Sequence, residues 1–147
     1  MNFAVKHDCK VIVFEYLTSL RPIKGKYSKR SNQKRMYWLK SKIYLYTSHI
    51  ARTKHNLLSA RVNPKNTSKY SAIDNSELLR TNDHEFAEYL ATNPSAWDTF
   101  KNTQGYHPGL WAISRNGYMI HSGLNACRNI GMKFYKRYTE KLKFVRV

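Results

Sequence analysis

The chain has 147 residues, of which 41% are apolar, and 26 Lys and Arg against nine Asp and Glu give it a formal net charge of +17. The length suits one domain, and the apolar content suffices for a core, which excludes wholesale disorder. No apolar run approaches the roughly 20 residues of a membrane span, and charged residues interrupt the N-terminal stretch at Lys6, Asp8 and Lys10, where a signal peptide would be apolar. We therefore expect a cytoplasmic protein with no membrane partner.

The first half of the chain predicts a strand, a helix and a second strand. Residues 11–14 form a continuous run of apolar, mostly branched residues, which is typical of a buried strand, and Glu15 follows them. Apolar residues spaced by three and four predict an amphipathic helix over residues 32–55. A short strand is expected at residues 58–62, before Pro64. This order is typical of a parallel α/β arrangement.

The second half predicts a helix, a hairpin and a last helix. A short helix is expected over residues 85–90, inside a polar and acidic stretch. Two short strand-like segments flank Asn116 and Gly117, which supply the positive φ angles of a tight hairpin turn. Residues 124–138 predict a helix in which Cys127 is a small packing residue. Because Cys9 and Cys127 lie far apart in sequence, a disulfide scaffold is disfavoured.

The positive charge is concentrated in two blocks. Residues 20–70 hold 14 Lys and Arg and no acid, residues 71–100 hold six of the nine acids, and the segment from Lys101 holds nine bases. A polyanion suits such blocks, because each neutralised phosphate releases condensed counterions. The alternative is a solvated basic face that binds nothing. Tyr27, Tyr37 and Trp38 lie within the first block and can stack on bases, which favours nucleic acid.

Three segments, in chain order, carry motifs of one known family. VIVFEYL resembles a strand written IVxEdL whose Glu is catalytic, with Glu15 at that place. VNPKNTSKYSAID is similar to VNPxxTSxxCxxCG, and WAISRNGYMIHSGLNACRNIG resembles FxCxxCGyxxxADxNAAxNI. Together they resemble the C-terminal half of the transposon-encoded, RNA-guided nucleases of the TnpB (OrfB) type and the related miniature type V CRISPR effectors. The family's other parts would precede Met1, so the chain would be a fragment, or a split or decayed relative.

The resemblance implies a fold and a division of the chain. The fold is α/β, a partial RNase H-like (RuvC) domain with a metal-free remnant of a zinc ribbon inserted. Residues 1–70 would form the RuvC-like strand, helix and strand. Residues 71–121 would form a degenerate ribbon-like insert with an acidic segment, and residues 122–147 a C-terminal RuvC-like helix and basic tail.

The metal sites that the resemblance implies are mostly lost. The family's nuclease site clamps two Mg²⁺ ions with several carboxylates; here Glu15 is kept, the last Asp falls on Gly123, and the first Asp has no counterpart. Glu15 is therefore expected to be vestigial, and Mg²⁺ is expected only if a partner completes the site. The four zinc cysteines of the family fall on other residue types, so Zn²⁺ is not expected. These positions are Ser71, Asp74, Ile113 and Asn116.

The leading interpretation is a nucleic-acid-binding, catalytically incapable derivative of a transposon-associated RNA-guided nuclease. Its phosphate contacts would come from the first basic block, with Trp38 anchoring the helix that presents them, and RNA and DNA are both open as partners. A partner subunit or a homodimer is expected to cover the open edge of the strand at residues 11–14. The expected phosphate-binding residues are Lys24, Lys26, Lys29, Arg30, Lys34 and Arg35.

Two other function classes stay open. One is an active Mg²⁺-dependent nuclease subunit whose missing carboxylates come from a partner chain, or from Asp74 or Asp83 folding back. The other abandons the family and makes the chain a basic structural protein of a ribonucleoprotein or phage particle. The presence or absence of metal-dependent cleavage separates the first from the leading interpretation.

Overall fold

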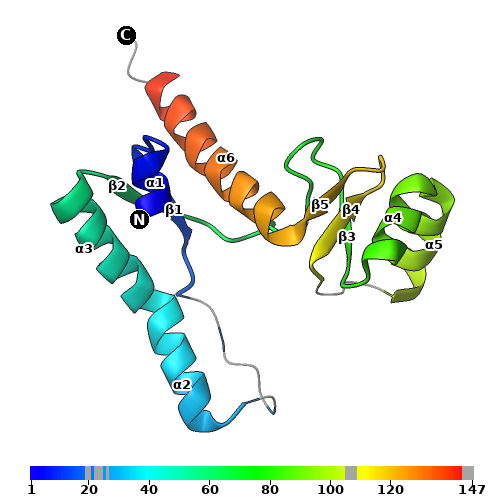
Figure 1. Ribbon diagram of the computed structural model, residues 1–147, viewed down its shortest axis with the longest axis horizontal. Coiled ribbons are helices and arrows are strands. Elements are labelled where there is room, and N and C mark those ends of the chain that lie inside the picture. The colour runs from blue at the N-terminus through cyan, green and yellow to red at the C-terminus, as the bar shows by residue number, and fades with distance from the viewer. Residues whose placement is uncertain (19–20, 22–24, 26, 105–108, 144–147) are drawn as a thin grey trace. The chain divides into compact units, whose positions relative to one another are not determined.

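The computed structural model describes residues 1–18, 21, 25, 27–104 and 109–143, without the side chains of residues 102–104 and 138–143. It confirms a mixed α/β protein (Figure 1). No helix within these ranges is long and apolar enough to cross a membrane. The chain divides into two compact units, the first formed by Met1–Pro64 with Lys136–Val147 and the second by Lys65–Tyr135.

The first unit contains a short helix, two strands and a long helical segment. Strands β1 and β2 pair in parallel, with Val11 opposite Leu58 and Glu15 opposite Val62. The carboxyl ends of both strands therefore lie at the same end of the sheet. The predicted strand, helix and strand are thus confirmed. The elements are α1 (Asn2–Lys6), β1 (Val11–Glu15), α2 (Lys29–Tyr37), the π-helical turn η1 (Trp38–Lys42), α3 (Ile43–His55) and β2 (Leu58–Val62).

The long helical segment is delimited by its own sequence. Ser28 caps its start, because the Ser28 hydroxyl accepts a hydrogen bond from the Ser31 N–H at 3.2 Å. Asn56 ends it in the left-handed conformation, with a φ of 51°. The predicted helix is therefore confirmed, although it begins at Lys29 and contains a π-helical turn that the spacing of apolar residues did not indicate.

The expectation that residues 11–14 form a buried strand is wrong. Every residue of β1 is only half-buried, and Leu58 on β2 is 68% exposed. Within the described ranges, each of these strands has one neighbour, so the sheet has two open edges. Residue type alone predicted burial, whereas burial also depends on how many strands and helices cover a sheet.

The second unit is built on an antiparallel sheet in the order β3–β4–β5. Strand β3 was not predicted, because LLRT is short and lies within the polar stretch. Helix α4 confirms the predicted helix, and α5 begins at Pro94, a residue suited to a first helical position. The elements are β3 (Leu78–Thr81), α4 (His84–Thr92), α5 (Pro94–Gln104), β4 (Trp111–Ser114), β5 (Met119–His121) and α6 (Ser122–Lys143), which continues into the first unit.

The hairpin between β4 and β5 is confirmed, but its turn differs from the expected one. Gly117 alone has a positive φ, of 81°, whereas Asn116 does not. The Gly117 N–H donates to the Ser114 carbonyl at 3.1 Å, and the Ser114 N–H donates to the Tyr118 carbonyl at 2.9 Å. The loop is therefore longer than two residues, which removes the need for a left-handed residue at Asn116.

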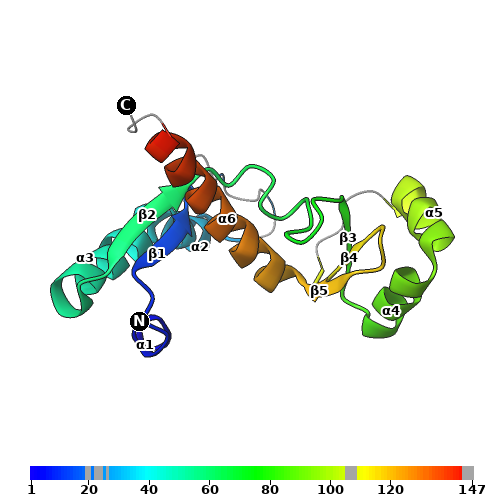
Figure 2. The ribbon, with the colours of Figure 1, turned by 90° about the horizontal axis from the view of Figure 1, so that it is seen from above.

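Helices α4 and α5 lie side by side and pack on the sheet of the second unit (Figure 2). The core contains Leu79 from β3, Leu90 from α4, Trp97 from α5 and Ile113 from β4, all buried. The Trp97 indole N–H donates to the Ile113 carbonyl at 3.1 Å, so its polar atom is satisfied inside the core. On α6, by contrast, Cys127 is exposed, so its predicted packing role is wrong.

We expect Leu90→Ala to lower the free energy of unfolding by about 2–5 kcal/mol, because it removes a fully buried side chain and leaves a cavity. Guanidinium denaturation of the full chain, followed by circular dichroism, measures this change. Leu124→Ala is the matched control, since Leu124 is exposed on α6 and its truncation should change stability by less than about 0.5 kcal/mol. Equal effects of the two substitutions would contradict the assigned core.

Candidate nucleic-acid interface

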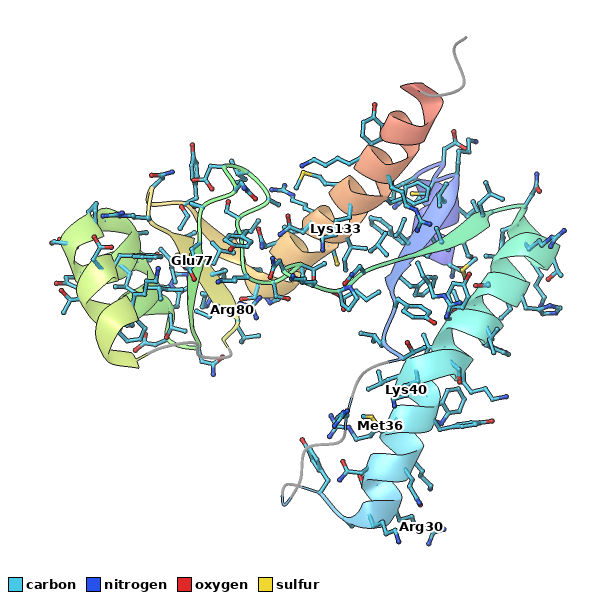
Figure 3. All side chains as sticks on the ribbon, turned by 180° about the vertical axis from the view of Figure 1, so that it is seen from behind. Arg30, Met36, Lys40, Glu77, Arg80 and Lys133 are labelled. Atoms are coloured by element: carbon cyan, nitrogen blue, oxygen red, sulfur yellow. The ribbon has the colours of Figure 1, made fainter. Side chains whose placement is uncertain are left out.

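Helix α2 carries a group of exposed cations, Lys29, Arg30, Lys34 and Arg35, here named the α2 cationic face. None of the four forms a salt bridge within the ranges that the structure describes. Figure 3 shows Arg30 near the start of α2, with its side chain pointing away from the ribbon. These four residues thus lie on one helix and are open to solvent, and their contacts to phosphates stay a prediction.

Lys24 and Lys26 were also expected to contact phosphates, and both lie outside the described residues. Tyr27, which follows Lys26 in the sequence, is described: its ring centroid lies 4.2 Å from the Arg35 guanidinium carbon. This cation–π contact restricts Arg35 and leaves its side chain at the surface.

Two aromatic side chains adjoin the α2 cationic face. Tyr37 is 55% exposed and Trp38 is 53% exposed, and their ring centroids lie 6.4 Å apart in an edge-to-face arrangement. The Lys42 ammonium lies 5.1 Å from the Tyr37 ring centroid. Trp38 is therefore not held by burial, and its role as an anchor of the helix stays a prediction. It presents an aromatic surface next to cations, which is the arrangement that stacks on unpaired bases.

Glu15 stands at the carboxyl end of β1 and is half-buried. Among the residues that the structure describes, no group of three or more His, Cys, Asp and Glu side chains is arranged to hold a metal ion. Gly123, at the place of the resembled last Asp, has no side-chain ligand to offer. One carboxylate cannot by itself hold two Mg²⁺ ions, which need several ligands each, so the residues that the structure describes do not fit a two-metal site.

Three of the four positions that correspond to cysteines in the resembled motif, Ser71, Asp74 and Asn116, are joined by hydrogen bonds around the Asp74 carboxylate. The Asn116 amide donates to Asp74 Oδ2 at 2.7 Å, and the Ser76 hydroxyl and N–H donate to Asp74 Oδ1 at 2.8 and 3.1 Å. The Ser71 hydroxyl accepts from the N–H groups of Ile73 and Asp74. We name Ser71, Asp74, Ser76 and Asn116 the Asp74 cluster. The fourth ribbon position, Ile113, is buried in the core.

The Asp74 cluster does not suit a structural zinc ion. Such an ion takes four thiolate, imidazole or carboxylate ligands, and the four positions offer one carboxylate, one hydroxyl, one amide and one aliphatic side chain. Hydrogen bonds hold the two turns together instead. Asn75 follows Asp74 with a φ of 60°, and Gly117 follows Asn116 with a φ of 81°. Each turn thus has a left-handed residue at the place where the resembled motif has a glycine after its second cysteine.

The hydrogen bonds of Asp74 set the pKa of its carboxyl group. Burial by itself would raise this pKa, but the hydrogen bonds from Ser71, Ser76 and Asn116 outweigh it and lower the pKa from 3.8 to about 2. The carboxylate is therefore ionised across the physiological range.

Two asparagines of the NACRNI segment connect α6 to the loop that follows β2. Asn125 is fully buried; its Oδ1 accepts from the Ala72 N–H at 2.8 Å, and its Nδ2 donates to the Tyr70 carbonyl at 2.9 Å. The Asn129 amide donates to the carbonyls of Thr67 and Tyr70 at 3.0 and 2.7 Å. The sequence interpretation matched this motif but assigned no role to its asparagines. The structure shows that they fix the loop that leads to the Asp74 cluster.

Sequence reasoning also missed Arg61, on β2. Its guanidinium carbon lies 4.7 Å from the Tyr16 ring centroid and 4.2 Å from the Tyr44 ring centroid. The only sequence signal was an Arg in a short strand that is otherwise rich in apolar and small residues. Its two aromatic neighbours come from β1's end and from α3, so no local pattern joins them.

No family model matches the sequence, and no curated protein matches it either. The function is therefore inferred from the residues of the chain and from the geometry described above. The α2 cationic face, with Tyr37 and Trp38 beside it, is the surface with the clearest binding chemistry.

We expect the stability of the second unit to depend on the ionisation of Asp74. Folding lowers the pKa of this carboxyl group. The resulting contribution of Asp74 to the free energy of unfolding is therefore fully present above about pH 5 and is lost as the pH falls through 3.8 towards 2. Urea unfolding at several pH values should show a steeper acid loss in the wild type than in Asp74→Asn. The control Asp98→Asn should keep the wild-type slope, and a parallel loss in all three proteins would contradict the assignment.

Proposed function

We propose that this protein binds nucleic acid through the α2 cationic face and the adjoining Tyr37 and Trp38, as a nuclease-dead, RNase H-like derivative of a transposon-associated RNA-guided nuclease. The observation that carries the proposal is the exposure of these aromatic rings beside four cations that form no salt bridge with any acid the structure describes. Phosphates neutralise such cations with release of counterions, and exposed rings stack on bases. Because phosphate contacts carry no base information, the binding has little sequence specificity.

The contrast with the second unit argues against a merely solvated basic face. There, Lys69 and Lys101 both pair with Glu77 and hold the pKa of its carboxyl group below the ordinary value. Arg115 pairs with Asp98, with Nη2 and Oδ2 2.8 Å apart. These three bases of the second unit are thus neutralised locally by its acids. Among the residues whose side chains the structure describes, the α2 cationic face has no such partners, which leaves its charge for an external anion.

Several features support the RNase H-like ancestry. The parallel pair of β1 and β2, joined through α2 and α3, has the strand and helix order that the resemblance implies, with Glu15 at a carboxyl end. The Asp74 cluster supports a ribbon remnant, since Asp74 and Asn116 stand where two cysteines stand in the resembled motif and are hydrogen-bonded to each other. The lone Glu15 supports a protein without nuclease chemistry.

The open edges of the β1–β2 pair favour a strand from another chain. Both strands have one neighbour within the described ranges, and their backbone groups on the other side are a template for strand addition. A partner subunit or a second copy of this chain fits this edge.

We expect nucleic-acid affinity to fall steeply with salt concentration. For single strands, each neutralised phosphate contributes a slope of about −0.7 to the plot of log affinity against log salt. The double variant Lys34→Gln/Arg35→Gln should therefore reduce the steepness by about 1.4 when fluorescence anisotropy is measured with single-stranded DNA and RNA. The double variant Arg52→Gln/Lys54→Gln is the matched control, with one Lys and one Arg at exposed positions of α3.

The two double variants separate the possibilities. A large change for the α2 pair and a small change for the α3 pair supports the proposed surface. Equal changes would mean that only total charge matters, and a salt-independent affinity of the wild type would contradict phosphate binding altogether.

Restoring cysteines tests the ribbon ancestry. We expect the variant Ser71→Cys/Asp74→Cys/Ile113→Cys/Asn116→Cys to bind one Co²⁺ with the absorption of a tetrahedral thiolate site, which Zn²⁺ displaces. The variant Ser71→Cys/Asp74→Cys alone is the control, since two thiolates cannot complete a four-ligand site. No tetrahedral spectrum in the fourfold variant would count against the remnant.

A further inference from the structure

A cavity of about 510 Å³ lies in the first unit beside the carboxyl ends of β1 and β2. Its lining includes Tyr16, Thr18, Arg61, Asn63 and Arg137. This position follows from the parallel pairing, because the residues that follow β1 and those that follow β2 leave the same end of the sheet. Ligands of parallel α/β sheets characteristically bind at the carboxyl ends of the strands.

Arg61 is held in place by aromatic rings rather than by carboxylates. Its guanidinium carbon lies over both the Tyr16 ring and the Tyr44 ring, 4.7 and 4.2 Å from their centroids. Tyr44 is itself fixed by an edge-to-face contact with Phe14, at 5.5 Å between ring centroids. A guanidinium that stacks on rings through its faces keeps its N–H groups directed outward in its own plane, as a fork for oxyanions.

The cavity has the chemistry of an anion site. Arg137, on α6, adds a second guanidinium, and none of the described residues that line the cavity is an acid. Neither arginine forms a salt bridge within the part of the chain that the structure describes. Two guanidinium groups without carboxylate partners suit a doubly charged phosphate monoester better than the singly charged diester within a nucleic-acid strand.

We propose that this cavity binds the monoester phosphate of a nucleotide, with Arg61 and Arg137 on the phosphate and the half-exposed Tyr16 ring against the base or sugar. The volume lies in the range of small-ligand sites and suits one nucleotide rather than a duplex. The phosphate belongs either to the 5′ end of a strand or to a free nucleoside monophosphate. In the first case the inference rests on the proposed function, since the strand lies along the α2 cationic face and ends in this cavity.

The test compares one single-stranded oligonucleotide with a 5′-phosphate and the same oligonucleotide with a 5′-hydroxyl, by fluorescence anisotropy with the full chain. We expect the phosphorylated form to bind about tenfold more tightly, the effect of one charge-assisted interaction. Arg61→Gln and Arg137→Gln should abolish this preference, and the control Arg52→Gln should keep it. Arg137 is exposed on α6, so its variant stays informative if Arg61→Gln unfolds the first unit, which circular dichroism reveals.

Calorimetry with AMP and with adenosine separates the two sources of phosphate. Binding of AMP but not adenosine, together with a phosphate preference among the oligonucleotides that AMP removes, supports a strand-end site. AMP binding by a protein that binds neither oligonucleotide supports a free-nucleotide site and overturns the proposed function. Equal, salt-dependent binding of both oligonucleotides without AMP binding overturns the cavity proposal and leaves the proposed function intact.

Discussion

The second unit depends on the buried amide of Asn125. An amide side chain without access to water is stabilising only when both of its ends are satisfied, and here the Ala72 N–H and the Tyr70 carbonyl satisfy them. These two bonds fix the backbone of the turn that contains Asp74. Within this turn, the Asp74 carboxylate accepts a hydrogen bond from the Asn116 amide of the β4–β5 hairpin. One buried residue on α6 therefore fixes a loop that is hydrogen-bonded to the hairpin of the sheet.

Charge separates the two parts of the chain as clearly as packing does. In the second unit the acids are used to pair neighbouring bases and to accept backbone hydrogen bonds, as at Glu77 and Asp83. In α2 and α3 there are no acids, so the cations repel one another until a counter-charge arrives. Such a surface is stabilised by its ligand. The cations of α2 are therefore a more suitable place for an added polyanion than those of the second unit, where acids already pair with neighbouring bases.

Local sequence patterns predicted which helices and strands form, but they did not predict the exposure or the neighbours of these elements. The apolar run at β1, the helical spacing before β2 and the Gly117 hairpin each depend on neighbouring residues, and each element formed. The exposure of β1 was not predictable, because it depends on which strands lie beside it. Arg61 was missed for the same reason, since its two tyrosine neighbours come from distant segments. The pairing of Asp74 with Asn116 joins residues that are 42 positions apart, and only the family motif hinted at it.

The π-helical turn η1 sets the rotational phase between α2 and α3. A π turn holds one residue more than an α turn, and each residue of an α-helix advances the side-chain direction by about 100°. The extra residue within Trp38–Lys42 therefore rotates the directions in which Arg30 and Lys34 project, relative to the side chains of α3. Loss of a single residue there would turn every side chain of α2 relative to α3 by about 100°, roughly a quarter of a revolution. The orientation of the α2 cationic face relative to α3 is thus encoded in the length of one five-residue turn.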